Sequence, residues 1–137
     1  MQDERTGMSD DVPGRGVERQ DAHGPVPRIA LAATDPSVRL RAALDAGTRP
    51  DPTAVPLLVD RCAVEPDFFV RDMLTWALTR HPAEVTVPLL LDALGAAVPQ
   101  ARSQALHTLS KIGDPAAWPH VSEALLRDED DEVARAA

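Results

Sequence analysis

Apolar side chains recur along most of this chain with the period of an α-helix. Three segments carry them at positions i, i+3 and i+7, which places the three side chains on one stripe of a helix. These stripes are Val55, Leu58 and Cys62; Val87, Leu90 and Leu94; and Trp118, Val121 and Leu125. Two similar stripes lie between them, at Val70, Leu74, Ala77 and Leu78 and at Ala101, Ala105, Leu109 and Ile112. The pattern predicts amphipathic helices, each of which must bury one face against a neighbour.

Polar turns between the stripes contain residues that start and stop helices. Asp35, Asp51 and Asp114 each precede a proline, an order typical of an N-cap followed by the first helical residue. Gly47 and Gly113 follow predicted helices, where a left-handed residue commonly ends the helix. These signals predict helices at about residues 27–33, 36–46, 52–63, 67–79, 83–95, 98–111 and 115–127, with a last helix beginning near 130.

Two short words repeat along the chain with one shared period. The sequence Val-Pro-Leu-Leu occurs at residues 55–58 and again 32 residues later at 87–90, and a degenerate copy follows at 118–121. A second word places Arg39, Arg71 and Arg102 at intervals of 32 and 31 residues. Two independent words with the same period predict helical hairpins that stack on one another.

The repeats define the expected fold class and domain organisation. We predict an all-α protein, an α-α superhelix of about three and a half helical hairpins. The repeat domain covers residues 28–137, with repeats at about 28–49, 50–81 and 82–113 and an incomplete one at 114–137. Residues 1–27 hold six acidic and three basic side chains and few apolar ones, which predicts a disordered acidic tail.

These features together resemble the HEAT-repeat family. A proline in the first helix, an Asp-Pro turn and a Val-Arg start to the second helix carry the resemblance. The repeats are most similar to a short bacterial type of about 31 residues, which is also seen in phycobilin-lyase-like proteins. The resemblance covers residues 28–137, and it implies a binding scaffold whose second helices line the concave face.

Composition and charge narrow the functional classes. Aromatic residues make up only 3% of the chain, so the core must consist of Leu, Val and Ala, which suits packed helices. The net charge of −8 argues against nucleic acid and anionic membranes as partners. No apolar run approaches a membrane span, and the acidic N-terminus does not resemble a signal peptide. We therefore expect a cytoplasmic protein.

The chain offers few residues for chemistry. None of the four histidines, His23, His81, His107 and His120, has another histidine at helical i, i+4 spacing, so we predict no metal site. Cys62 shares its register with Leu94 and Leu125, which predicts a buried, inert thiol. No motif combines an acid, a base and a nucleophile, so we predict no catalytic residue and no cofactor.

The arginine word and an acidic run each have two interpretations. Arg39, Arg71 and Arg102 could hold carboxylates or phosphates, but we favour a structural role in which each pairs with an acid such as Asp35, Asp67 or Asp72. The run of five acidic residues at 128–132 could bind a cation or a basic partner. We favour a solvated loop before the last helix, where negative charge complements the helix dipole.

One face of the second helices is the expected binding surface, because Trp and Arg concentrate interface energy. The predicted partner-binding residues are Arg71, Asp72, Thr75, Trp76, Thr79, Arg102 and His107, with Leu44 and Arg39 extending the patch. The alternative is that Trp76 only closes the groove between repeats.

The sequence therefore predicts a non-enzymatic scaffold for a protein partner whose identity it does not specify. Self-association through the incomplete C-terminal repeat is a further option. The alternatives are a bilin-lyase-like enzyme or chaperone on the same repeats, which needs an exposed thiol or aromatic pocket, and a nucleic-acid-binding HEAT protein. The second of these is disfavoured because residues 28–137 carry 11 basic against 16 acidic side chains.

Overall fold

The computed structural model describes residues 28–136 of the chain, with side chains as far as Asp128. Within these residues all regular structure is helical and no strand is present. The α-helices are α3 (Arg28–Leu31), α4 (Pro36–Thr48), α5 (Val55–Cys62), α6 (Phe68–Thr79), α7 (Ala83–Ala93), α8 (Pro99–Ile112) and α9 (Trp118–Ala136). Two 3₁₀ turns, η2 (Pro52–Ala54) and η3 (Pro115–Ala117), lead directly into α5 and α9.

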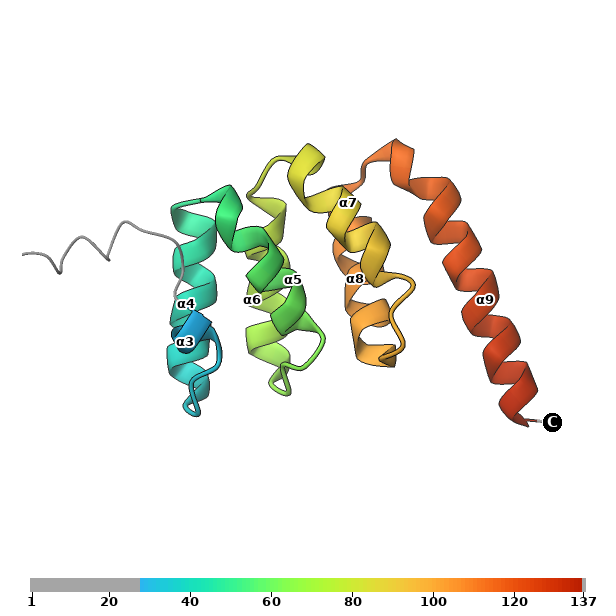
Figure 1. Ribbon diagram of the computed structural model, residues 1–137, viewed down its shortest axis with the longest axis horizontal. Helices are drawn as coiled ribbons and strands as arrows, with labels where there is room; N and C mark the ends of the chain where they lie inside the picture. The colour runs from blue at the N-terminus through green and yellow to red at the C-terminus, as the bar shows by residue number, and fades with distance from the viewer. Residues whose placement is uncertain (1–27, 137) are drawn as a thin grey trace, which may run out of the picture.

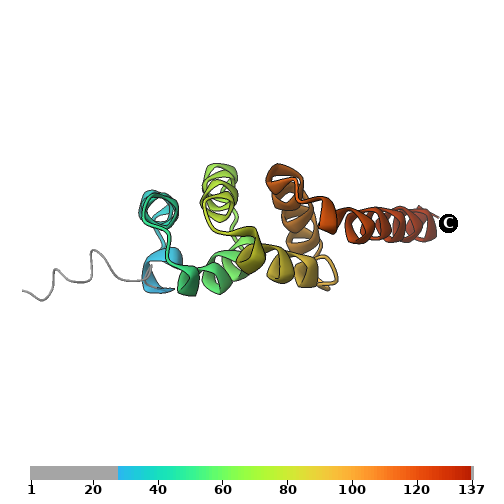
Figure 2. The same cartoon turned by 90° about the horizontal axis from the view of Figure 1, so that it is seen from above.

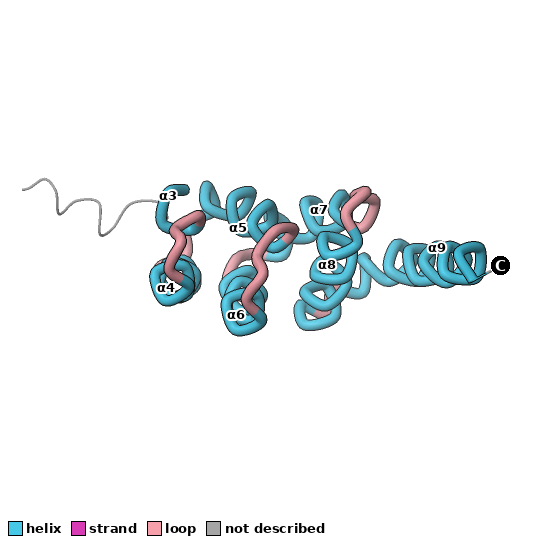
Figure 3. The backbone as a smooth tube through the Cα atoms, turned by 90° about the horizontal axis from the view of Figure 1, so that it is seen from below, coloured by secondary structure: helices cyan, strands magenta, loops and turns pink. Residues whose placement is uncertain are grey.

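The helices form two layers, as Figures 1 and 2 show. The second helices of the hairpins, α4, α6 and α8, stand side by side in one layer, and α3, α5, α7 and α9 form the other (Figure 3). Neighbouring helices of the same kind pack against each other, α4 on α6, α6 on α8 and α5 on α7. This arrangement confirms the predicted all-α superhelix of stacked hairpins.

One continuous apolar core runs between the layers. It is built from the predicted stripes of α5, α6, α7 and α8, which are buried at every position except the half-buried Ile112. Leu58, Leu74 and Leu78 are fully buried, and each hairpin adds its own leucines to the cluster. On α9 the stripe differs from the prediction, because Val121 and Ala124 are buried while Trp118 and Leu125 are exposed. Among the described residues no second helix covers that side of α9.

The turns use the predicted capping residues. Asp35, Asp51 and Asp114 accept hydrogen bonds from the backbone N–H two residues on, and Asp67 caps α6 in the same way. Gly113 ends α8 in the left-handed conformation at φ 70°. The corresponding prediction for Gly47 is wrong, because Gly47 is buried inside α4. Its small size serves packing, since a Cβ there would collide with the indole ring of Trp76 on α6.

The predicted break before residue 130 is also wrong. Helix α9 continues without interruption from Trp118 to Ala136, so the acidic run at 128–132 lies inside a helix rather than in a loop. A proline lies in the turn before α6 (Pro66) and at the first position of α4 (Pro36) and α8 (Pro99), whereas neither proline nor glycine occurs after Pro119. Glutamate and alanine favour the helical conformation, so α9 continues through the acidic run.

Two further points concern the expected tail and membrane association. The tail predicted for residues 1–27 lies outside the described residues. None of the helices in the described range is both long and apolar enough to cross a lipid bilayer.

Candidate partner-binding groove

A polar groove lies between the second helices α6 and α8. It encloses about 270 Å³ and is lined by Phe68, Arg71 and Asp72 from α6 and by Ser103, Gln104 and His107 from α8. Cationic, anionic and hydroxyl groups thus face one another beside an exposed aromatic ring. We refer to these six residues as the α6–α8 groove.

Hydrogen bonds join the two helices that flank the groove. The hydroxyl groups of Thr75 and Thr108 are hydrogen-bonded at 2.9 Å, and Gln104 donates from Nε2 to the Thr75 hydroxyl at 2.7 Å. Both threonines are buried. Thr75 therefore joins α6 to α8, and its predicted place on the partner-binding surface is wrong.

The three repeated arginines make the same contact with the backbone. In each, Nη1 donates to the carbonyl groups six and five residues earlier, in the turn before its own helix. Arg39 reaches Ala33 and Thr34, Arg71 reaches Glu65 and Pro66, and Arg102 reaches Ala96 and Ala97, all at 2.8–3.2 Å. The arginine word therefore braces the turn inside every hairpin.

Two of these arginines also form ion pairs, but not with the predicted acids. Arg39 binds both carboxylate oxygens of Glu65, at 2.8 and 2.9 Å, and Arg102 binds Asp128 at 3.1 Å. Both pairs join successive hairpins, which confirms the predicted structural role for Arg39 and Arg102. The acids proposed from sequence were wrong, since Asp35 and Asp67 cap helices instead.

Among the described residues, Glu65 is the acid whose carboxylate joins the most hydrogen-bond partners. Its carboxylate is fully buried and accepts hydrogen bonds from Arg39, from Arg61 at 3.0 Å and from the Asp67 N–H at 3.0 Å. Burial acts to raise the pKa of the carboxyl, but these hydrogen bonds outweigh it and the pKa lies below its ordinary value. The hydrogen bond from Glu65 likewise raises the pKa of Arg39.

Trp76 belongs to the junction between α4 and α6. Its ring packs over Gly47, and the Arg80 guanidinium lies 5.9 Å from the ring centroid. Arg80 also reaches the Gly47 carbonyl at 3.4 Å. Trp76 is 38% exposed, so one edge of the ring remains on the surface. Thr79 is exposed and donates to the Trp76 carbonyl.

The structure thus brings together only part of the predicted surface. Arg71, Asp72 and His107 line one groove, whereas Trp76 and Thr79 are not among the residues that line it. Sequence reasoning missed Phe68, Ser103 and Gln104. Phe68 was detectable, because it precedes the core residue Val70 by two positions and so points away from the core. Phe68 and Phe69 are 63% and 71% exposed, with their rings edge to face.

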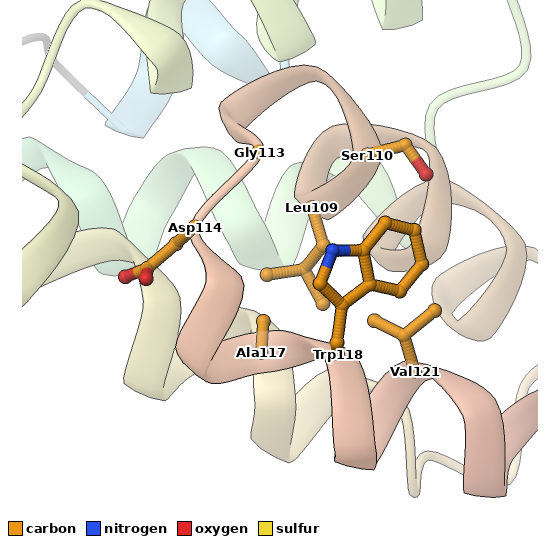
Figure 4. Close-up of a pocket in the computed structure, with 7 residues that line it drawn as sticks. All are labelled: Leu109, Ser110, Gly113, Asp114, Ala117, Trp118 and Val121. Atoms are coloured by element: carbon orange, nitrogen blue, oxygen red, sulfur yellow. The ribbon is translucent and has the colours of Figure 1, made fainter.

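A second hollow, where α8 meets α9, is too small for a ligand. Figure 4 shows the Trp118 indole beside Leu109, Ser110 and Val121. The enclosed space is about 10 Å³, roughly enough for one water molecule.

Cys62 and the histidines are the remaining candidates for catalysis or metal binding. Cys62 is buried, as predicted, and burial together with the charge of Glu65 raises the pKa of its thiol to about 12. His81 is buried with Nδ1 donating to the Ala77 carbonyl, His107 and His120 are exposed, and His23 lies outside the described residues. In the part of the chain that the structure describes, no three His, Cys, Asp or Glu side chains cluster as metal ligands do.

Two layers of antiparallel hairpins around one linear core define an α-solenoid, a class in which each repeat contacts its neighbours. Comparison with protein families identifies the repeat. The family model for HEAT repeats matches residues 25–100 and again residues 66–137. The chain belongs to the HEAT-repeat family. Among curated proteins no similar sequence was found.

Proposed function

We propose that this protein is a cytoplasmic, non-enzymatic scaffold of the short bacterial HEAT type that binds a partner protein in the α6–α8 groove. The observation that carries the proposal is the composition of that groove. It combines an exposed aromatic ring, Phe68, with the guanidinium of Arg71 and the exposed imidazole of His107. Aromatic and arginine side chains are the ones that concentrate binding energy at protein interfaces.

The state of Cys62 favours a scaffold over a lyase-like protein that uses a thiol. A thiol acts as a nucleophile in its deprotonated form. With a pKa of about 12 and little exposure, Cys62 stays protonated at neutral pH. The α6–α8 groove contains no cysteine.

The charges in the groove favour a protein partner over a nucleic acid. Binding to a phosphate backbone relies on several cationic groups that act together. Here Arg71 is accompanied by the carboxylate of Asp72, and the whole chain has a net charge of −8.

Site-specific photo-crosslinking tests the proposal. A photoreactive phenylalanine replaces His107 in the groove or, as a matched control, the exposed His120 in the other layer on α9. In cells that naturally produce the protein, we expect a discrete crosslinked protein from position 107 and none from position 120. Equal crosslinking at both positions, or crosslinking only at position 120, would contradict the assignment of the groove.

A further inference from the structure

The three repeated arginines use the two edges of the guanidinium group for different contacts. The first edge, Nη1, braces the turn before the helix in all three. The second edge, Nε and Nη2, carries a carboxylate in two of them. Arg39 binds Glu65 through both nitrogens, and Arg102 binds Asp128 through Nε.

Arg71, the middle member, has no such carboxylate from the described residues. Ala96 stands where Glu65 stands in the preceding hairpin, because each backbone carbonyl accepts Nη1 from the arginine six residues on. Glu65 sends its side chain back to the arginine of the hairpin before it, whereas Ala96 ends in a methyl group. Within residues 28–128 no carboxylate oxygen lies within 4.0 Å of the Arg71 guanidinium.

Arg71 itself borders open space. Arg71 is half-buried and lines the α6–α8 groove. The hydroxyl of Ser103 and the imidazole of His107 line the same groove and can donate hydrogen bonds. Asp72 lies there too, but adjacent helix residues do not face each other and no ion pair joins it to Arg71.

We propose that Arg71 binds the side-chain carboxylate of an aspartate or glutamate on the partner protein. The proposal rests on the proposed function and specifies the chemistry that the groove recognises. The partner's carboxylate takes the place that Glu65 occupies on Arg39 and Asp128 on Arg102. A guanidinium presents a planar fork that matches a carboxylate, and such charge-assisted bonds are strong and directional.

The other residues of the groove further restrict the amino-acid composition of the partner segment that can bind. Phe68 offers an exposed apolar wall, which suits an apolar residue next to the acidic one. Asp72 repels additional negative charge, so a segment with a single acidic side chain fits better than a polyanion. Phosphate-rich ligands are disfavoured for the same reason.

An NMR titration of the full chain tests the site without knowledge of the partner. The protein is labelled with ¹⁵N-arginine and titrated with N-acetyl-glutamate amide, which has a free side-chain carboxylate. The neutral control is N-acetyl-glutamine amide. We expect a saturable shift of the Arg71 Nε–H signal with the glutamate compound only. The Arg39 Nε–H signal should stay unchanged, because Glu65 already occupies that edge.

Three results of the titration would overturn the proposal. They are no saturable shift at Arg71, equal shifts with the glutamine compound, and a stronger response to inorganic phosphate than to the carboxylate. Assignment of the signal uses Arg71→Lys, which removes it while keeping the positive charge.

Crosslinking to the partner also allows a matched comparison of substitutions at Arg71 and Arg102. Arg71→Gln removes a turn brace and the proposed site, whereas Arg102→Gln removes the same brace and an arginine whose carboxylate is supplied by Asp128. Crosslinking from position 107 should fall about tenfold or more in Arg71→Gln and persist in Arg102→Gln. If wild type and Arg71→Gln crosslink equally, the carboxylate site is wrong and the proposed function stands. If the titration succeeds but position 107 never crosslinks, the proposed function fails alone.

Discussion

At the scale of single residues, the packing of α4 against α6 depends on Gly47. The Cβ that another residue would carry there lies 3.0 Å from the Ala77 Cα and 2.7 Å from Cε3 of Trp76. Glycine inside a helix normally costs about 0.5–1 kcal/mol relative to alanine. Its presence in the last turn of α4 therefore reflects the space that Trp76 needs.

We predict that Gly47→Ala destabilises the protein, against the usual effect of this substitution in a helix. Forcing a methyl group into a packed contact costs about 1–3 kcal/mol. Chemical denaturation measures the change in the free energy of unfolding. In a Trp76→Ala background the penalty should shrink markedly, because the indole ring no longer opposes the methyl group. An increase in stability in the wild-type background would contradict the packing described for Trp76.

Glu65 provides the second prediction at this scale, since it joins Arg39, Arg61 and the α6 cap in one buried cluster. Glu65→Ala leaves the buried Arg39 without its anion, which costs about 3–5 kcal/mol. The exposed change Glu84→Ala should cost less than about 0.5 kcal/mol. Urea unfolding of the two variants distinguishes a buried ion pair from an ordinary surface acid.

The pH dependence of stability follows from the lowered pKa of Glu65. A carboxyl whose pKa is lower in the folded state contributes stability above its unfolded pKa of about 4.3. That contribution is lost as the pH falls through the folded pKa. In Glu65→Gln the decline in stability below about pH 4 should therefore be shallower than in wild type. Parallel declines would show that other groups dominate acid unfolding.

The sequence predicted residue roles well where a local signal existed, and poorly where the role depended on a distant partner. The capping aspartates and Gly113 act on their own turns, so their patterns were sufficient. Arg39 pairs with a residue 26 positions away, and no local pattern distinguishes Glu65 from Asp35 as its acid. Thr75 was placed on the surface because its partner Thr108 lies on another helix.

At the scale of elements, the helices were predicted wherever a proline or glycine marked an end. The apolar stripes and capping residues located α4 to α8 to within a few residues. The ends of α9 show the limit of that reasoning. The repeat period suggested a turn near residue 128, but the chain there contains no helix breaker, and a 19-residue helix results.

Proline positions give a prediction at this scale, because the repeated Val-Pro word falls at different points of its helices. Pro56 is the second residue of α5, in the first turn, where a backbone N–H has no acceptor within α5 itself. Pro88 is the sixth residue of α7, so the Glu84 carbonyl lacks the usual donor.

We therefore expect Pro88→Ala to raise the free energy of unfolding by about 1–3 kcal/mol. Pro56→Ala should change it by less than about 0.5 kcal/mol. Both prolines are exposed, so neither substitution opens a cavity. Thermal and chemical denaturation of the two variants measure the difference. If Pro88→Ala destabilises the protein instead, the proline shapes α7 for its packing against α8.

At the scale of the whole molecule, the repeat period alone indicated stacked hairpins, and the layers in Figure 1 follow from it. The groove could not be predicted to the same degree. Its lining combines residues from α6 and α8 whose side chains meet only after the hairpins stack. The sequence grouped Arg71, Asp72 and His107, which the structure brings together in one groove, but it did not separate this groove from the α4–α6 junction that holds Trp76.

Stacking also determines how far the destabilisation caused by one substitution extends along the hairpins. Leu90 is buried in α7, which packs against both α5 and α8, whereas Leu31 is buried in the four-residue helix α3 beside α4. Leu90→Ala should lower the global free energy of unfolding by about 2–5 kcal/mol, because neighbours on both sides lose contacts. Leu31→Ala should lower it far less, since α3 can open locally and its loss is limited to that opening. Hydrogen exchange is the decisive measurement: protection should fall across α5 to α8 in the first variant and only near α3 and α4 in the second. Equal global destabilisation by both would mean that the described hairpins unfold as one unit rather than as a chain of coupled neighbours.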